Sequence, residues 1–433
     1  MKKLLSVVLS LVMMFCVVCA ASAETDSLFV SDKAFTLNIN TNQKSDEELA
    51  LIEAAIEVYR QMYPNCELKI NYGVDTSDLN DYATRLLSQF ASGDQIDILW
   101  MAVEGIAFLA GNGVIAPLDD YIEANEAIRT RLSEDVAAPV LACMQFDGKT
   151  YGLPLGWNNT LVMYNTKMFE EAGLEYKDSW TWEEFIDAAQ KLTHQDENGE
   201  KVYGLALNFN LSDYLPFLAA NGTFDMNETL TESWWNKQET IDTFQFILDL
   251  VKKYEVCVYP EKTYYSSYFR AGRIAMMMGG PWAISAFEPH EFTDYDFMNL
   301  PSSTGTTKGC SFGGDGYCMT TACENPDEAL AFMDLLTNDS IQMMMARLGT
   351  SSPSTRSAAY SEEFLAHAPH VSLHYDIVLD PLANSRVISS PVFRPDMENA
   401  FSENWAKCLA GEITVEEMCL NMHAEVEAMI AEQ

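Results

Sequence analysis

The chain has 433 residues, and its 26 basic and 64 acidic residues give a formal net charge of −38. A charge of this size repels polyanions, so it excludes nucleic acid as a partner and argues against strongly anionic ligands. Hydrophobic residues make up 48% of the chain, which is enough for ordinary globular cores. A chain of this length is expected to form two domains.

The first 23 residues have the three parts of a secretory signal peptide. A charged start at Lys2-Lys3 is followed by an apolar run from Leu4 to Val18 and by the small residues Ala21-Ser22-Ala23. We therefore expect cleavage after Ala23 and a secreted, extracytoplasmic protein, in the periplasm or at the cell surface. No lipid anchor is expected at Cys19, because lipid attachment requires a small residue before the cysteine and Val18 stands there. Loss of the two lysines changes the formal charge from −38 to −40.

Eight of the ten cysteines follow the predicted signal peptide. None of them forms a Cys-x-x-Cys pair, so a zinc ribbon or a thioredoxin-like site is unsupported. Their spacing does not resemble a small disulfide scaffold, and a large core needs no covalent staples. We expect buried free thiols, with pairing in an exported protein as the alternative. Cys408 and Cys419 lie about three helical turns apart, on one face if the helix is continuous.

Strands and helices alternate along the first part of the chain. Two helices are predicted, one opening at Ser45 with Glu48 as its capping-box partner and one spanning Leu79 to Phe90. The predicted strands are Phe35 to Ile39, Glu67 to Gly73 and Asp97 to Met101. Such alternation indicates βαβ units and a largely parallel sheet.

The same alternation resumes after Pro154. Predicted helices are Trp182 to Leu192 (capped by Thr181 with Glu184), Ile241 to Lys253, Asn325-Pro326 to Leu336, and a final helix from Thr414 with Glu417. Predicted strands are Tyr203 to Asn208 and Ile274 to Met278. No linker rich in Pro, Gly or Ser separates two halves.

The strand Ile274 to Met278 ends in a sharp turn followed by an aromatic residue. Its apolar run stops at Gly279-Gly280-Pro281, and Trp282 comes next. Such a run fits a strand that is buried on both faces, and Pro281 can open the next helix. Trp282 would then lie at the carboxyl end of a strand, where open α/β sheets bind ligands. The alternative is that Trp282 is a core residue.

This segment resembles the corresponding stretch of family 1 extracellular solute-binding proteins, the maltose-binding-protein-like, sugar-capturing subunits of ABC importers. Further stretches resemble the same family and occur in the same order. They are Asp97 to Met101, Gly113 to Asp120, Tyr151 to Leu155, Met163 to Leu174, Trp180 to Phe185 and Asn325 to Phe332.

The resemblance implies an α/β fold of the two-lobed periplasmic-binding-protein type II, with discontinuous lobes around a ligand cleft joined by hinge crossings. The implied crossings lie near Leu155–Thr160, Phe297–Ser302 and Gly349–Pro353. They give an N-terminal lobe of residues 24–156 plus 300–350 and a C-terminal lobe of residues 157–299 plus 351–433.

The resemblance also implies a function. We expect a non-enzymatic monomer without a cofactor or bound metal, which captures a mono- or oligosaccharide and delivers it to the transmembrane subunits of an ABC importer.

Sugar capture sets the chemistry of the candidate site. One face of a pyranose packs on a flat aromatic ring, and its hydroxyl groups need planar donors and acceptors. Segments that follow predicted strands supply these groups. The candidate ligand-binding residues are Asn42, Gln43, Glu104, Trp157, Asn158, Asn208, Tyr214, Trp282, Gly314, Asp315 and Arg394.

By resemblance, Glu104 takes the position of a sugar-binding acid. Asn158 stands where maltose-binding protein has a glutamate, so a carboxylate role is not transferred to it. The turn Gly313 to Gly316 is expected to present Asp315. The alternatives are a turn-forming Asn42, a solvated Glu104 and a Trp157 that packs the lobes.

One enzyme motif occurs and is not expected to act. Gly309 to Gly313 matches Gly-x-Ser-x-Gly, but that motif needs a helix directly after the serine, and here the strand-like segment Tyr317 to Thr321 follows. His367, His370 and His374 could align on a helix, yet Pro369 disfavours one, so we expect a loop rather than a metal site.

Three other functions remain open. A binder of a polyamine, peptide or metal chelate would suit the acidity, a secreted glycosidase or esterase would turn its ligand over, and an adhesin would bind no tight small ligand.

Overall fold

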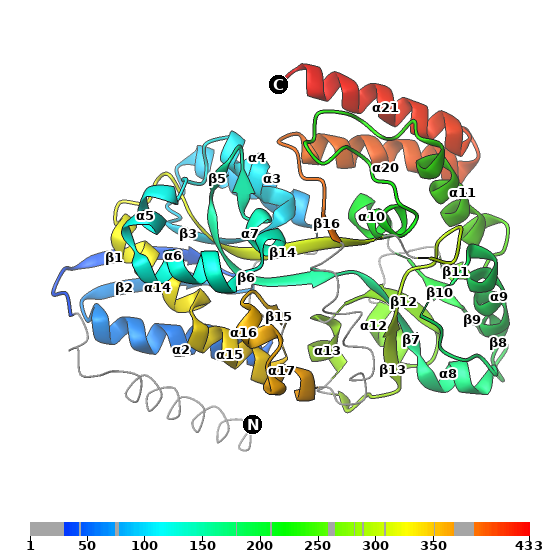
Figure 1. The fold of residues 1–433 in the computed structure, drawn as a ribbon, viewed down its shortest axis with the longest axis horizontal. Coiled ribbons are helices and arrows are strands. Elements are labelled where there is room, and N and C mark those ends of the chain that lie inside the picture. The colour runs from blue at the N-terminus through cyan, green and yellow to red at the C-terminus, as the bar shows by residue number, and fades with distance from the viewer. Residues whose placement is uncertain are drawn as a thin grey trace. The chain divides into compact units, whose positions relative to one another are not determined.

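The computed structural model describes residues 30–42, 45–73, 78–178, 180–207, 210–258, 265–280, 282–287, 290–306, 309–349, 351–367 and 385–433. Within these residues the chain forms two compact units, each built of helices and a sheet (Figure 1). Unit 1 comprises Met1–Ala102, Leu109–Gly156 and Gly314–Phe364, and unit 2 comprises Val103–Phe108, Trp157–Gly313 and Leu365–Gln433. This architecture confirms the predicted α/β fold class, with both units assembled from discontinuous segments.

The divisions between the two units fall after Gly156, Gly313 and Phe364. The short segment Val103–Phe108 also belongs to unit 2, although the strand before it belongs to unit 1.

The first sheet is centred on unit 1. Its strands are β1 (Phe35–Asn40), β2 (Cys66–Asn71), β3 (Ile98–Ala102), β6 (Gly152–Asn159), β14 (Cys310–Met319), β15 (Ser352–Pro353) and β16 (Ser385–Val387). Their order is β15-β6-β14-β3-β1-β2, with β16 pairing β14 off this path. β1 is parallel to both β2 and β3, as predicted, while β14 runs antiparallel to β3.

In unit 1, helix α2 packs against α14 and α15 (Figure 1). The capping box of Ser45 and Glu48 at the start of α2 is confirmed. Tyr59 of α2 meets Phe332 of α14 edge to face, with ring centroids 5.0 Å apart. The helical elements are α2 (Asp46–Met62), α3 (Leu79–Ser92), α4 (Val103–Gly111, which begins in unit 2), α5 (Asp119–Ala124), α6 (Glu126–Thr130), η1 (Arg131–Asp135), α7 (Ala138–Ala142), α14 (Pro326–Thr337), α15 (Asp339–Leu348), α16 (Arg356–Ala359) and α17 (Glu362–His367). A small hairpin joins β4 (Gln145–Phe146) to β5 (Lys149–Thr150).

The sheet of unit 2 has the order β11-β10-β12-β7-β13. Its strands are β7 (Leu161–Asn165), β10 (Leu205–Ala206), β11 (Cys257–Val258), β12 (Met276–Gly279) and β13 (Tyr295–Met298), beside a hairpin of β8 (His194–Gln195) and β9 (Lys201–Val202). The helices are α8 (Thr166–Glu171), α9 (Trp182–Leu192), α10 (Leu211–Ala220), α11 (Gln238–Lys252), α12 (Tyr265–Arg270), α13 (Trp282–Phe287), α20 (Arg394–Ala410) and α21 (Val415–Ala431). The capping boxes at Thr181 and Thr414 are both confirmed.

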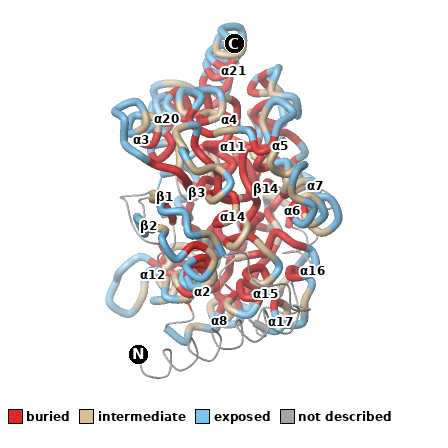
Figure 2. The backbone as a smooth tube through the Cα atoms, turned by 90° about the vertical axis from the view of Figure 1, so that its left-hand side faces the viewer, coloured by how far each residue is buried: buried red, intermediate tan, exposed pale blue. Residues whose placement is uncertain are grey.

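The core of unit 2 is rich in aromatic side chains. Trp235 stacks on Phe244 at 5.1 Å and Phe401 stacks on Trp405 at 6.0 Å, while Tyr214 meets Phe244 edge to face. These rings come from α10, α11, α20 and the loop before α11, so they join the helices that cover this unit. Figure 2 shows which parts of the chain are buried. All five residues of β3 in unit 1 are buried.

One sequence prediction is wrong. Gly313 to Gly316 is not a turn but lies inside β14, because its residues pair with β3 up to Ala102. The helix between Cys408 and Cys419 is not continuous, because α20 ends at Ala410, its C-cap Gly411 is in the left-handed conformation (φ 75°), and α21 begins at Val415. Both thiols are buried, and none of the eight cysteines in the described part of the chain forms a disulfide. Five of the eight are buried, as expected, whereas Cys66, Cys310 and Cys323 are half-buried.

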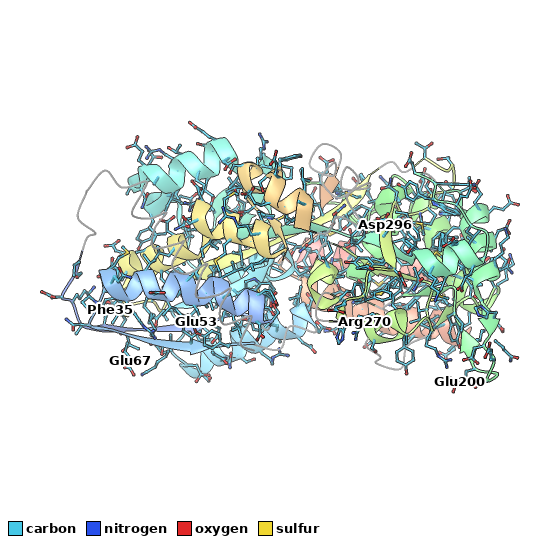
Figure 3. All side chains as sticks on the ribbon, turned by 90° about the horizontal axis from the view of Figure 1, so that it is seen from below. Phe35, Glu53, Glu67, Glu200, Arg270 and Asp296 are labelled. Atoms are coloured by element: carbon cyan, nitrogen blue, oxygen red, sulfur yellow. The ribbon has the colours of Figure 1, made fainter. Side chains whose placement is uncertain are left out.

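Acidic side chains are exposed in both units. Glu53 of α2, Glu67 of β2 and Glu200 are all exposed (Figure 3). Among the described residues, no helix has the length and apolarity that a membrane span requires.

Candidate functional site

Polar side chains gather at one edge of the unit 1 sheet. Since β1 and β3 are parallel, their carboxyl ends meet at this edge. Thr41, directly after β1, is fully buried, and its hydroxyl lies 3.0 Å from the hydroxyl of Tyr317 on β14. Asn42 follows and is half-buried. Gln43, the other candidate after β1, lies outside the described residues.

Asp315 is fixed by an indole group on the neighbouring strand. Trp100 of β3 pairs directly with Tyr317 of β14, and Asp315 lies two residues away on the same face. The Trp100 Nε1–H donates to Oδ2 of Asp315 at 2.7 Å, and the hydroxyl of Tyr82 donates to the Trp100 carbonyl at 3.3 Å. Asp315 remains half-buried, so the predicted candidate lies on a rigid strand with part of its side chain accessible.

Gly314 serves close packing in this structure. A Cβ at this position would lie 3.1 Å from the Cβ of Cys143 and 3.3 Å from the carbonyl oxygen of Gly156. Its φ is not in the left-handed region, so a glycine is favoured here by the close approach of Cys143 and Gly156 rather than by backbone conformation.

Glu104 occupies the first turn of α4, directly after β3. Its side chain is buried, with 9% of the residue exposed, and none of the described residues gives its carboxylate a side-chain hydrogen bond or an ion pair. Burial raises the pKa of this carboxyl group, and the nearby Glu398 raises it further, while the backbone N–H of Glu104 itself and the charge of Arg394 act in the opposite direction. A buried acceptor without a side-chain partner is suited to bind a hydroxyl group of a ligand.

The backbone around Glu104 is held by a serine that follows β16. The Ser390 hydroxyl lies 2.8 Å from the carbonyl oxygen of Val103 and 3.0 Å from that of Glu104. This contact attaches the start of α4 to unit 2.

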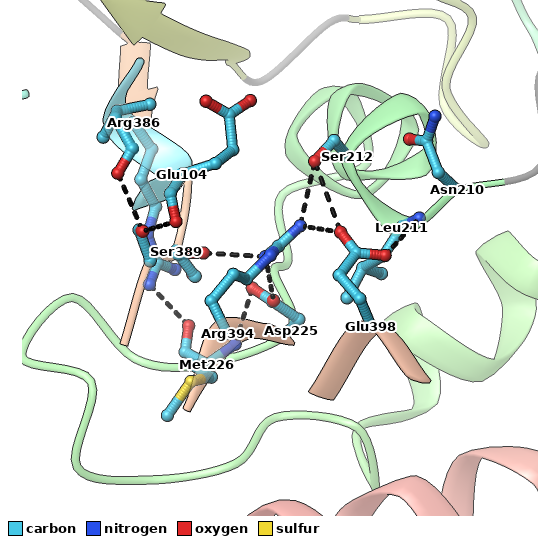
Figure 4. Close-up of polar contacts among 12 residues, drawn as sticks. Glu104, Asn210, Leu211, Ser212, Asp225, Met226, Arg386, Ser389, Arg394 and Glu398 are labelled. Carbon is cyan, nitrogen blue, oxygen red and sulfur yellow. Dashed lines mark hydrogen bonds and ion pairs between the residues drawn. The ribbon is translucent and has the colours of Figure 1, made fainter. Parts of the chain in front are cut away.

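Arg394, another candidate, is fully buried and its guanidinium is surrounded by protein groups (Figure 4). It donates to the Ser389 carbonyl at 2.7 Å, to the Ser212 hydroxyl at 2.9 Å and to Glu398 at 2.5 Å. A longer ion pair, 3.7 Å, joins it to Asp225. The carboxylate of Glu104 extends away from these contacts in Figure 4.

Two further candidates lie in packed surroundings. Trp157 of β6 is 1% exposed and stacks on Phe312 of β14, with ring centroids 5.2 Å apart and planes inclined by 27°. Tyr214 of α10 is fully buried in the aromatic core of unit 2. Asn158, next to Trp157, is half-buried.

Other candidates cannot be placed. Asn208 lies outside the described residues. Trp282 is the first residue of α13, but its side chain is outside the described part of the structure. The same applies to the side chain of His367 and to His370 and His374.

The segment with the Gly-x-Ser-x-Gly pattern lacks the strand–turn–helix context of a nucleophile elbow. Ser311 lies inside β14 and is 1% exposed, and the strand continues to Met319. In the described part of the chain, no group of three or more His, Cys, Asp or Glu side chains is placed to hold a metal ion.

Unit 2 also has an open surface hollow of about 500 Å³, lined by residues of α8, α9 and α12 that include Lys167, Lys191 and Arg270 (Arg270 is labelled in Figure 3). No candidate residue lines it.

Several residues of these clusters were not predicted. Thr41, Trp100 and Tyr317 lie on predicted strands or next to one. The hydrogen bonds of their side chains are made with residues distant in sequence, so no local sequence pattern indicates them. Glu398 is four residues after Arg394, a spacing that indicates an ion pair on a helix and was available from the sequence. Asp225 lies far from Arg394 in sequence, and Ser390 lies far from Glu104. Only the fold brings the members of each pair together.

Comparison with known proteins identifies the class. Residues 50–372 match the family of bacterial extracellular solute-binding proteins. This match covers more than half of the chain, and the protein therefore belongs to that family.

Individual relatives are distant. The chain is 23% identical to an arabinooligosaccharide-binding protein of Halalkalibacterium halodurans over 66% of this chain and 64% of that protein. It is 25% identical to a maltotriose-binding protein of Pyrococcus abyssi over 55% of this chain and 48% of that protein. The matched part thus spans less than two thirds of these relatives. An ABC substrate-binding protein of Listeria monocytogenes, solved in complex with cycloalternan, has the same fold, with a TM-score of 0.80 at 21% identity over 93% of this chain and 100% of that one.

Proposed function

We propose that this protein captures an uncharged carbohydrate, a mono- or oligosaccharide, outside the cytoplasmic membrane and delivers it to the transmembrane subunits of an ABC importer. The observation that carries the proposal is Glu104, a buried carboxylate with no side-chain partner in the described structure, at the start of a helix directly after a strand. Such a group accepts hydrogen bonds from hydroxyl groups, which a sugar supplies in number.

The comparisons support this ligand class. The proteins similar to this chain are named for arabinooligosaccharide and maltotriose, and the Listeria structure holds cycloalternan. The half-buried carboxylate of Asp315 adds a second acceptor on a rigid strand. The formal charge of −38 disfavours anionic ligands and leaves neutral sugars unaffected.

The delivery step includes a hinge motion in this proposal. The predicted lobes, residues 24–156 plus 300–350 and residues 157–299 plus 351–433, are proposed to change their relative orientation when ligand binds. Small-angle scattering with and without ligand measures this, and identical profiles at saturating ligand would contradict it.

The proposal is tested by titration calorimetry of the protein lacking residues 1–23 against maltotriose, arabinotriose, cycloalternan and mannitol. Mass spectrometry of native protein identifies any ligand that co-purifies. We expect an uncharged sugar to bind and to be recovered unchanged. Binding of a polyamine that weakens steeply with salt, with no sugar bound, would replace the proposal with a cationic cargo. Recovery of a hydrolysed sugar would indicate an enzyme.

A further inference from the structure

Arg394 lies where helix stability alone does not favour an arginine. It is the first residue of α20, and a cation there opposes the positive N-terminal end of the helix dipole. The preceding Phe393 offers no side-chain cap. The guanidinium is also fully buried, and removing a charge from water costs several kcal/mol before its partners compensate. These costs suggest that the position serves something other than stability.

The partners of Arg394 belong to three separate segments of unit 2. Through the Ser389 carbonyl it holds the segment in which Ser390 bonds the backbone of Glu104. Through Ser212 and Glu398 it holds the start of α10, because the other oxygen of Glu398 accepts the Leu211 N–H at 3.1 Å.

The third segment is Phe224–Met226. Its Asp225 pairs with Arg394, and its Met226 carbonyl accepts a hydrogen bond from Arg386 of β16 at 2.5 Å (Figure 4). The Arg386 guanidinium also lies 4.2 Å from the centroid of the Phe224 ring. One buried guanidinium therefore connects the start of α4, the start of α10 and this loop.

We propose that Arg394 is a positioning residue, which acts through Ser389 and Ser390 to fix Glu104 and through Glu398 to fix the start of α10, and which does not contact ligand itself. This inference rests on the proposed function, because Glu104 is the proposed sugar contact.

The charges that face this cluster come from every element around it. Arg394 and Glu398 belong to α20, Asp225 to the loop before α11, Arg386 to β16 and Glu104 to α4. Burial raises the pKa of Asp225 as it does that of Glu104, and the charge of Arg394 opposes both shifts. Removal of this charge should therefore move the titration of Glu104 to higher pH.

Three variants test the inference. Ser390→Ala removes only the hydroxyl that holds Glu104. Arg394→Lys keeps the charge but loses the planar fork that reaches several partners at once. Arg394→Met removes the charge. Matched controls are Ser133→Ala, an exposed hydroxyl that donates to a backbone carbonyl, and Lys253→Met, an exposed cation paired on α11.

The first readout is affinity for the sugar identified from the panel. A hydrogen bond is worth about 0.5–1.5 kcal/mol, so Ser390→Ala should weaken binding by roughly 2- to 10-fold. Arg394→Lys, which loses several such bonds, should weaken it by roughly 10-fold or more. The controls should bind like the original protein.

The second readout needs no ligand. The carboxyl group of Glu104, followed by NMR in ligand-free protein, should titrate at higher pH in Arg394→Met, and the Leu211 amide should exchange faster in both Arg394 variants. The Glu104 titration reports the charge of Arg394, and the Leu211 exchange reports whether the start of α10 is held.

The outcomes separate the two proposals. If no sugar binds the original protein, the proposed function fails, and the Glu104 titration and the Leu211 exchange still decide whether Arg394 holds these segments. If the Arg394 variants do not fold, Ser390→Ala decides. Unchanged affinity in Ser390→Ala, or in a folded Arg394→Lys variant, would overturn the inference, and so would a Glu104 titration that is unchanged in Arg394→Met.

Discussion

Trp100 and Asp315 are joined by a hydrogen bond of 2.7 Å across the antiparallel pair of β3 and β14. The indole N–H is the only hydrogen-bond donor of a tryptophan side chain, and here it fixes the orientation of the Asp315 carboxylate. The second oxygen of the Asp315 carboxylate is also a hydrogen-bond acceptor. An acid held in this way loses little conformational entropy when it binds a ligand.

Replacing Trp100 by Phe should weaken ligand binding while keeping the fold. The ring would still fill most of its site, but Asp315 would lose the hydrogen bond from the indole N–H, at a cost of about 0.5–1.5 kcal/mol in stability. We expect affinity for the bound sugar to fall by roughly 2- to 10-fold, as measured by calorimetry. Glu57→Gln, an exposed acid of α2, is the control. An unchanged affinity would remove Trp100 and its partner Asp315 from the proposed binding site.

Replacing Glu104 by Gln should weaken ligand binding without lowering the stability of the fold. A hydrogen bond to a charged group is worth about 1.5–3 kcal/mol, so we expect affinity to fall by roughly 10- to 100-fold. Stability should be unchanged or higher at neutral pH, because the variant no longer buries an ionised carboxylate. Chemical denaturation and calorimetry measure the two quantities. A variant that is destabilised and binds normally would show that Glu104 is structural.

The raised pKa of Glu104 also sets a pH dependence of stability. Because the folded state holds this proton more tightly than the unfolded chain, its contribution to stability is full below the unfolded-state pKa of about 4.3 and is lost as pH rises through the folded-state value. We expect the difference in unfolding free energy between Glu104→Gln and the original protein to grow in favour of the variant over this window. A pH-independent difference would contradict the shift.

Local signals in the sequence were sufficient for the framework. Each of the three capping boxes joins two residues three positions apart, so Ser45, Thr181 and Thr414 could be recognised without tertiary information. The parallel pairing of the first strands followed from the alternation of helix and strand periodicities, which indicates βαβ units.

The sites depended on contacts that no local pattern contains. Asp225 reaches Arg394 only because α20 returns to the loop before α11. Trp157 was a candidate for stacking on sugar because an aromatic residue near a crossing can face either solvent or another ring, and its stacking on Phe312 could be known only from the fold. The glycines of Gly313 to Gly316 indicated a turn, but two of them lie in close packing. A Cβ on Gly314 would lie 3.1 Å from the Cβ of Cys143, and one on Gly316 would lie only 2.2 Å from the Leu153 carbonyl oxygen.

The buried thiols should be unreactive in the native protein. Burial raises the pKa of Cys257 to about 12 and that of Cys408 to about 11, so neither forms the thiolate that reacts at neutral pH. We expect a disulfide-exchange reagent to label them only after denaturation, and dithiothreitol to leave the melting temperature unchanged. A melting temperature that falls on reduction would indicate disulfides, contrary to the free thiols of the structure.

Trp157 and Trp282 should respond to substitution in opposite ways. Trp157 is 1% exposed and stacked on Phe312, so Trp157→Ala should cost about 3–5 kcal/mol of stability through the cavity that it leaves. Trp282 is predicted from sequence to stack on ligand, and Trp282→Ala should weaken sugar binding by about 1.5–3 kcal/mol, the range for burial of a large apolar side chain, with little change in stability. Denaturant unfolding and calorimetry on both variants test the contrast. If Trp282→Ala folds normally and binds with unchanged affinity, the stacking role of its ring is excluded, and sugar recognition would have to depend on polar groups such as Glu104 and Asp315.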